Sequence, residues 1–115
     1  MSYTLTKHQD IPKKEKCEVS LDVYPSIGDC GFVIVETTTG HNQEFYDTES
    51  TFTYIVLEGN GSFFLNDEEV PVEKGDHISI PPKTRIHYKG TMRLALITNP
   101  AWKAENEVET KSTIW

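Results

Sequence analysis

Four polar residues in the middle of the chain are the strongest candidates for chemistry: His41, Glu44, Asp47 and His87. Imidazole nitrogens and carboxylate oxygens are the ligands that zinc, iron and related metal ions take from proteins. The spacing of the first three residues matches no established metal-binding motif. They would converge with His87 only if a one-residue bulge after Pro82 turned His87 inward. If they converge, these four residues would form a metal site with an unusual set of ligands, which we call the alternative metal site.

Nothing in the sequence indicates catalysis without a metal. The chain contains no recognisable nucleophile–base pair and no phosphate-binding loop. Of the remaining histidines, His8 lies in the leading segment and His77 begins a predicted strand, so both are expected to be exposed. Arg93 is expected on the outer surface. Cys17 and Cys30 are too isolated for a disulfide framework or a zinc site, and we interpret them as small buried residues.

The composition limits the partners of the protein. The chain has 115 residues, a formal net charge of −7 and 37% hydrophobic residues. That length suits one folded domain, and the negative charge argues against binding to nucleic acid, which needs clustered Lys and Arg. No apolar run is long enough to cross a membrane, and the N-terminus lacks a secretory signal. We therefore expect a cytoplasmic protein that binds neither nucleic acids nor membranes.

Short apolar runs separated by turn residues predict an all-β fold. From Val19 to Val23 apolar and polar residues alternate, as in a half-buried strand. Further predicted strands cover residues 30–36, 52–58, 62–65, 70–73, 77–80, 85–88 and 92–98. Residues 59–61 predict a hairpin turn, Pro71 predicts an edge strand, and residues 37–50 read as a polar loop. About eight short strands favour a β-sandwich or a small barrel.

From Glu36 to Trp102 the sequence resembles the cupin family. Residues 54–61 are similar to the end of the family's first motif, and residues 75–82 are similar to the start of the second. The matching glycines and prolines form turns, so they report the fold rather than the chemistry. The resemblance implies a double-stranded β-helix, or jelly-roll barrel. It places one cupin domain over residues 1–115, with a core barrel at about 17–102 and a charged tail at 103–115.

The metal ligands of the family are missing at the corresponding positions. Phe52 stands where the family has a glutamate, and Ile86 stands where it has a histidine. The family's histidine pair falls on one of two pairs of residues, Phe45 with Asp47 or Tyr46 with Thr48. Phenylalanine and isoleucine side chains donate nothing to a metal ion. We therefore predict no metal at the usual cupin site and no cofactor.

The positions that would line the barrel are mostly aromatic. They are Phe45, Asp47, Phe52, Tyr54, Ile86, His87 and Tyr88. These side chains either fill the interior or line an apolar pocket for a small ligand, and the sequence does not decide between the two. The leading hypothesis is a metal-independent protein that binds or senses a small molecule. The alternatives are a metal-dependent isomerase, decarboxylase or dioxygenase with the unusual ligands, and a structural dimerisation module.

A second copy of the chain is the expected partner. In the predicted strand that begins at Phe52 both faces are apolar, with Phe52 and Tyr54 on one and Ile55 and Leu57 on the other. A strand that is apolar on both faces must be covered on both. Because the resemblance implies dimers, which are common among cupins, we predict a homodimer that covers the outer face. The terminal pair 114–115, Ile and Trp, is expected to dock on the body or on a partner.

Overall fold

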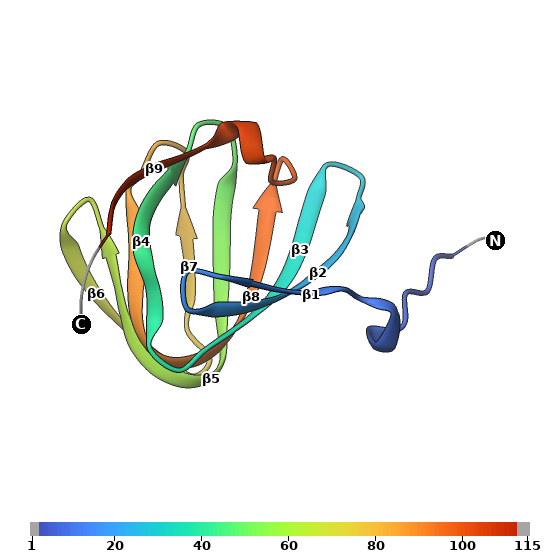
Figure 1. The fold of residues 1–115 in the computed structure, drawn as a ribbon, viewed down its shortest axis with the longest axis horizontal. Coiled ribbons are helices and arrows are strands. Elements are labelled where there is room, and N and C mark those ends of the chain that lie inside the picture. Colours follow the sequence, from blue (N-terminus) through green and yellow to red (C-terminus); the bar gives the residue numbers. More distant parts are fainter. Residues whose placement is uncertain (1–2, 113–115) are drawn as a thin grey trace.

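The computed structural model describes residues 3–112, which form an antiparallel β-barrel (Figure 1). The strands are β1 (Lys13–Lys16), β2 (Val19–Ile27), β3 (Cys30–Thr37), β4 (Gly40–Asp47), β5 (Thr51–Leu65), β6 (Glu68–Glu73), β7 (His77–Ile80), β8 (Ile86–Asn99) and β9 (Glu107–Ser112). Two short 3-10 helices, η1 (His8–Asp10) and η2 (Ala104–Asn106), precede β1 and β9. The predicted all-β jelly-roll barrel is confirmed.

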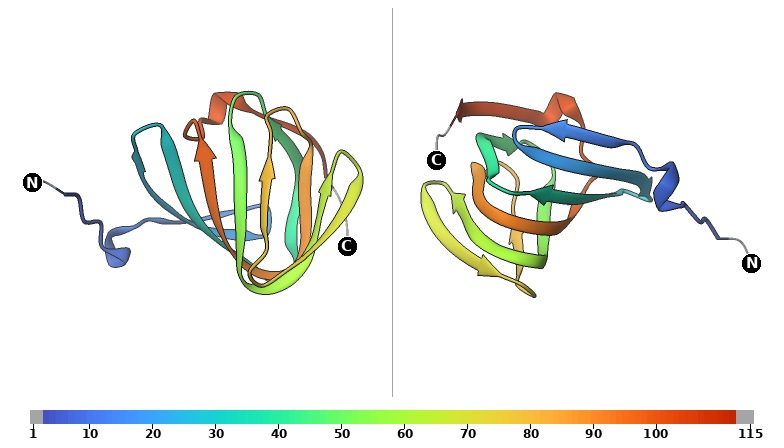
Figure 2. Two further views of the ribbon diagram at one scale, coloured as in Figure 1. Left: turned by 180° about the vertical axis from the view of Figure 1, so that it is seen from behind. Right: turned by 60° about the horizontal axis from the view of Figure 1, so that its bottom comes forward.

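A single sheet curls on itself to make the barrel. Among the described residues its strand order is β1-β2-β3-β8-β4-β9, and β5 pairs with β6, β7 and β8. β5 and β8 are long enough to bend and to serve both walls, because one half of β5 pairs with β7 and the other half with β6. Figure 2 shows the two walls facing each other above the bend. The inner faces of both walls therefore border one interior.

Alternation along β5 decides which side chains enter that interior. Phe52, Tyr54 and Val56 are buried, whereas Ile55 and Leu57 on the opposite face are only half-buried. This is the assignment of faces that the sequence predicted. The other strands add to the same core the buried residues Val19, Val35, Phe45, Phe63, Val72, Ile80, Ile86, Tyr88, Met92, Leu94 and Leu96. Burial of these side chains is the main stabilising contribution to the fold.

The segment around Gly59 is a bend inside β5 and not a hairpin, so the hairpin prediction is wrong. Gly59 has a φ of +86°, a left-handed conformation that favours glycine. Gly61 allows a close approach of β8, because a Cβ there would lie 2.2 Å from the carbonyl oxygen of Lys89. Since β8 bends alongside and keeps pairing through this region, the chain crosses from one wall to the other without leaving the sheet.

Three segments that the sequence did not predict as strands also belong to the sheet. Residues 37–50, predicted as a polar loop, contain β4, so that prediction is wrong. β4 is polar because only some of its side chains face the core, and its backbone is paired with β8 on one side and β9 on the other. The charged tail supplies η2 and β9, and β1 precedes residue 17, so the sheet extends beyond both expected limits of the barrel. The residues at 114–115 lie outside the described part of the chain.

Several smaller predictions are confirmed. Pro71 lies on β6, which pairs only with β5 in the described structure and is therefore an edge strand. Arg93 points outward to Glu36, and His77 is exposed. Cys17 and Cys30, which were expected to be buried, are only half-buried, so that prediction is wrong.

None of the helices described in residues 3–112 is long and apolar enough to cross a membrane.

Candidate functional site

His41 is the histidine that enters the barrel interior. It lies near the start of β4 opposite Tyr88 of β8, and only 6% of its surface is exposed. Its Nδ1 is 2.8 Å from the carbonyl oxygen of Gln43. A carbonyl oxygen can only accept a hydrogen bond, so Nδ1 of the neutral ring carries the proton. The lone pair of Nε2 is then free to act as a base.

The surroundings of His41 keep its ring neutral. Burial is the main cause and lowers the pKa of His41 to about 4, and the charge of Lys16 acts in the same direction. The Gln43 carbonyl and the Glu107 carboxylate oppose this shift without cancelling it. At neutral pH the imidazole is therefore an uncharged proton acceptor.

Two tyrosines form an aromatic cluster beside His41. The ring of Tyr88 lies 5.6 Å from the His41 ring and 5.8 Å from the Tyr54 ring, centroid to centroid. Phe63 contacts both tyrosine rings at 4.9 Å, and Phe45 lies 5.0 Å from His41. Burial raises the pKa of both tyrosines, so their hydroxyl groups remain protonated and can donate hydrogen bonds in an apolar setting.

Three side chains from separate segments of the chain, Lys16, Trp102 and Glu107, form a group through their mutual contacts. Lys16 at the end of β1 pairs with Glu107 at the start of β9, with 2.5 Å between Nζ and Oε2. The indole of Trp102 donates a hydrogen bond to the other Glu107 oxygen at 3.0 Å, and Lys16 Nζ lies 5.4 Å from the Trp102 ring centroid. The charges of Lys16 and Glu107 act on the interior, since both affect the pKa of His41.

The interior does not supply the ligands of a cupin metal centre. Phe52 and Ile86, at the positions of a glutamate and a histidine in the family, are buried with apolar neighbours. Phe45 also points inward, against Phe52. Within residues 3–112 no group of three or more His, Cys, Asp or Glu side chains is arranged to hold a metal ion. The residues of this site therefore do not fit the metal that the fold family implies.

The four residues of the alternative metal site are not brought together. Glu44 and His87 lie near each other, with 3.6 Å between His87 Nδ1 and Glu44 Oε2. Glu44 also binds Arg85 and Thr110, and the His87 ring stacks on Phe64. This cluster lies on the outer face of the wall, because Ile86 and Tyr88 on either side of His87 face the core. The inward bulge that would have moved His87 is not formed.

Asp47 lies at the far end of β4 from His41. Its Oδ1 accepts hydrogen bonds from the backbone N–H groups of Glu49 (2.8 Å) and Ser50 (2.6 Å). This arrangement fixes the turn between β4 and β5, as Asx side chains commonly do. Asp47 thus has a clear structural role, distinct from the cluster around His41.

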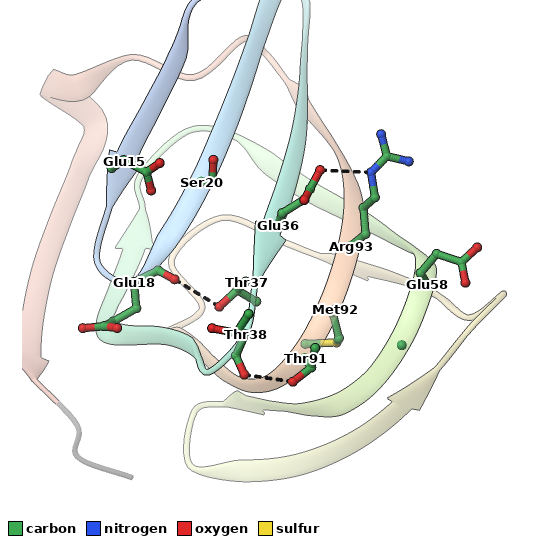
Figure 3. Close-up of a pocket in the computed structure, with 11 residues that line it drawn as sticks. Glu15, Glu18, Ser20, Glu36, Thr37, Thr38, Glu58, Thr91, Met92 and Arg93 are labelled. Atoms are coloured by element: carbon green, nitrogen blue, oxygen red, sulfur yellow. Dashed lines mark hydrogen bonds and ion pairs between the residues drawn. The ribbon is translucent and has the colours of Figure 1, made fainter.

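An open groove of about 500 Å³ lies away from the interior cluster (Figure 3). Figure 3 shows Glu15 and Glu18 on one side of it and Glu58 and Arg93 on the other. None of the residues that line it belongs to the aromatic cluster, and Arg93 is already paired with Glu36. Most of its charged residues are solvated carboxylates. The residues suited to chemistry are in the barrel interior and not in this groove.

Sequence reasoning found part of this site and missed part. Tyr54, Tyr88, Phe45 and Phe52 were expected in the interior, and they are there. His41 was considered only as a metal ligand, since its neighbours were placed in a loop. The group of Lys16, Trp102 and Glu107 was not found, because 91 positions separate Lys16 from Glu107. The one available signal in the sequence was Trp102, which directly precedes the charged tail.

The fold and the aromatic interior define a small cupin protein, and comparison with solved structures agrees. KdgF from Halomonas sp. is 13% identical, with 90% of this chain and 98% of that chain covered at a TM-score of 0.74. Ectoine synthase from P. lautus is 13% identical, with coverages of 98% and 94% and a TM-score of 0.71. At such low identity these similarities show the fold alone.

A more similar structure identifies the family. Streptomyces Pac13, described as a nucleoside dehydratase, is 35% identical over 99% of this chain and 95% of its own, at a TM-score of 0.92. The chain therefore belongs to the family of Pac13. Three Pac13 variants at 33–34% identity have been solved with uridine. No protein-family model and no curated protein matches the chain. Its role is that of a cupin-type protein that binds or transforms a small molecule.

Proposed function

We propose that this protein is a metal-independent dehydratase that acts on a nucleoside, with His41 as its acid–base residue. The observation that carries the proposal is a buried, neutral imidazole held by the Gln43 carbonyl so that Nε2 is free beside Tyr54 and Tyr88. The proposal revises the leading hypothesis from the sequence, which was binding or sensing without catalysis.

The names of the Pac13 structures support the assignment of these three residues. One variant solved with uridine has a histidine replaced by glutamine, and two others have a tyrosine replaced by phenylalanine. The numbers of the changed positions each exceed by one the numbers of His41, Tyr54 and Tyr88. Since the two chains align over 99% of this one, a constant offset of one is what equivalent positions would give.

A dehydration needs a base for a C–H proton and an acid for the departing oxygen. In our proposal Nε2 of His41 takes the proton, and a C=C bond forms as the C–O bond breaks. The imidazolium then returns that proton to the departing oxygen, which leaves as water and restores the neutral ring. The neutral hydroxyl groups of Tyr54 and Tyr88 donate hydrogen bonds to oxygen atoms of the substrate. Atoms and charges balance without a metal or redox cofactor.

The pKa of His41 restricts the substrates that can react. A base whose conjugate acid has a pKa of about 4 removes only a strongly acidified C–H proton, such as one next to a carbonyl group. We therefore expect binding of simple nucleosides, and turnover of nucleosides that carry a carbonyl group on the sugar next to the carbon that loses the proton.

The test is an assay for loss of water. Purified protein is incubated with uridine and with sugar-oxidised nucleosides, and the products are analysed by mass spectrometry, with and without a metal chelator. We expect one water to be lost from an oxidised nucleoside, at a rate that the chelator leaves unchanged. Uridine binding without turnover of any oxidised nucleoside would favour the binding protein. Activity that the chelator abolishes would favour the metal-dependent enzyme.

A further inference from the structure

The two end strands of the sheet meet without backbone pairing. In the described part of the chain β1 and β9 are the first and last strands of the path β1-β2-β3-β8-β4-β9, and neither pairs with the other. Both lie on the near side of the barrel in Figure 1. We call this junction the β1–β9 seam. Each strand presents there an edge that side chains, not main-chain hydrogen bonds, must cover.

Three side chains bridge the seam. Lys16 comes from β1, Glu107 from β9, and Trp102 from the segment that leads to η2. Glu107 is the centre of the group, since one carboxylate oxygen binds Lys16 and the other accepts from the Trp102 indole. The Glu107 side chain is 11% exposed, whereas the Lys16 side chain is 33% exposed. The bridge is thus mostly buried at its Glu107 end and open to water at its Lys16 end, so Lys16 is the partner that can turn out into solvent.

The seam borders the strand that carries the proposed reaction site, because β9 pairs with β4 between Gln43 and Asp47 and His41 lies two residues before Gln43. The charges of Lys16 and Glu107 both act on His41, and the charge of Glu107 also acts on Tyr54. Coulombic effects of this kind reach a buried ring only from nearby groups. No other charged side chain contributes to the pKa of His41 among its main causes. Lys16 and Glu107 therefore lie near enough to the ring for their charges to act on it.

The rest of the wall is continuous. β8 is paired with β3 along residues 31–37 and with β5 along residues 51–65. At the bend the strands are too close for a side chain, since a Cβ on Gly90 would lie 2.5 Å from the Asn60 carbonyl oxygen. Between the other two edge strands, β6 and β7, apolar side chains of Val72 and Ile78 pack on the core.

The loops at the end opposite the bend are also tied together. The N–H of Thr48 donates to the Asn106 carbonyl at 2.9 Å, and the N–H of Lys83 donates to the Asp47 carbonyl at 2.7 Å. Ser50 Oγ donates to the Pro100 carbonyl at 2.7 Å. Opening this end would break backbone hydrogen bonds, whereas opening the seam needs only side-chain rotation.

We propose that ligands enter and leave the barrel through the β1–β9 seam, and that Lys16, Glu107 and Trp102 form its gate. Rotation of the long Lys16 and Trp102 side chains away from Glu107 opens the route, and their return shields His41 from water. This proposal rests on the proposed function in one respect: the ligand that the gate admits is a nucleoside that binds at His41.

The first test needs no ligand. Diethyl pyrocarbonate acylates neutral imidazole nitrogens, and mass spectrometry gives the rate at each histidine, with exposed His77 as an internal reference. Lys16→Met and Glu107→Gln each break the ion pair, and Lys74→Met is the matched control because Lys74 pairs with Glu58 on the outer surface. We expect His41 to react more slowly than His77 in the unchanged protein. Both seam variants should accelerate His41 severalfold and leave His77 and the control unchanged.

Three results would overturn the gate. They are equal rates at His41 and His77 in the unchanged protein, no acceleration at His41 in either seam variant, and an equal acceleration in Lys74→Met. A second arm adds uridine, which should slow the acylation of His41 in every variant. If uridine gives no protection, the proposed function fails while the comparison of rates without ligand still decides the gate.

Discussion

His41 and His87 lie on adjoining strands of one wall but face opposite sides of it, and the two sides have different chemistry. His41 faces the interior, where its ring contacts aromatic side chains and its Nδ1 donates a hydrogen bond to a backbone carbonyl. His87 faces outward beside Glu44, within a network that includes Arg85 and Thr110. The inner ring has a free nitrogen, whereas the outer cluster holds strands together.

The comparison shows how a cupin barrel without the usual metal ligands can hold a neutral histidine in its interior. In the interior, burial dominates the pKa of His41, and the opposing Glu107 carboxylate acts on it only through its charge. On the outer face burial also lowers the pKa of His87, but the nearby Glu44 carboxylate opposes the shift. A neutral base needs an apolar setting, whereas an ionic network needs charged partners. The two settings lie on opposite faces of one sheet.

The largest expected effect is on catalysis. His41→Gln should lower the rate of water loss from an oxidised nucleoside by about 10²–10⁴-fold, the usual contribution of a general acid–base residue. His87→Gln, on the outer face, should retain most of the activity. Equal losses of activity in the two variants, or a larger loss in His87→Gln, would contradict the different roles of the two histidines.

The next effect is on stability in acid. The unfolded chain holds His41 at its ordinary pKa of 6.5 and the folded chain at about 4. Above pH 6.5 both states are neutral, and as the pH falls towards 4 only the unfolded state gains a proton. The free energy of unfolding should therefore fall by about 3 kcal/mol over this range on account of His41 alone. Denaturant titrations at neutral pH and near the lower limit measure it.

The control for acid stability is the same titration on His41→Gln. Glutamine does not titrate, so the variant should lose less stability than the unchanged protein between the two pH values, by the contribution of His41. The carboxylates and the other histidines titrate equally in both proteins, so their contributions cancel in the difference. An identical loss in the two proteins would show that His41 is protonated normally in the folded state.

The outer network should matter for stability and not for activity. Glu44 is only 1% exposed and accepts a hydrogen bond from Thr110 Oγ1 at 2.6 Å. Glu44→Gln removes the charge that faces Arg85 and should cost about 1–3 kcal/mol of unfolding free energy. Asp67→Asn changes an exposed partner of the same arginine and should therefore cost less than Glu44→Gln. Equal effects in chemical denaturation, or a loss of activity in Glu44→Gln, would contradict this division.

Formation of a homodimer is expected to have the smallest effect on the barrel interior. The homodimer stays a prediction, based on the half-buried outer positions of Ile55 and Leu57. Light scattering at micromolar concentration should give the mass of two chains, and Leu57→Glu should shift it to one chain with little change at His41. A monomer mass for the unchanged protein would show that this face needs no cover.

Particular residues show what the sequence could and could not predict. Strand alternation placed Phe52, Tyr54 and Ile86 in the interior correctly, because period two is a local property. β4 was read as a loop because its pairing, with β8 and β9, is not local and its sequence is polar. The bend at Gly59 imitates a hairpin, since both need left-handed backbone.

The positions of the protons in the site were even harder to predict from the sequence than the strands were. They depend on the contact between Lys16 and Glu107 across 91 positions and on the direction of the His41 ring towards the Gln43 carbonyl. Neither leaves a period or a motif in the sequence. Burial, which sets the pKa of His41, is a property of the assembled barrel.

The most direct test of the account is nitrogen NMR of the histidine rings, titrated with acid and then with uridine. We predict that the His41 ring titrates near pH 4, that at neutral pH its proton is on Nδ1 and Nε2 is bare, and that uridine shifts its signals more than those of His87. A His41 midpoint at the ordinary value of 6.5, or a uridine response confined to His87, would contradict the central claim that a neutral interior histidine is the reactive group.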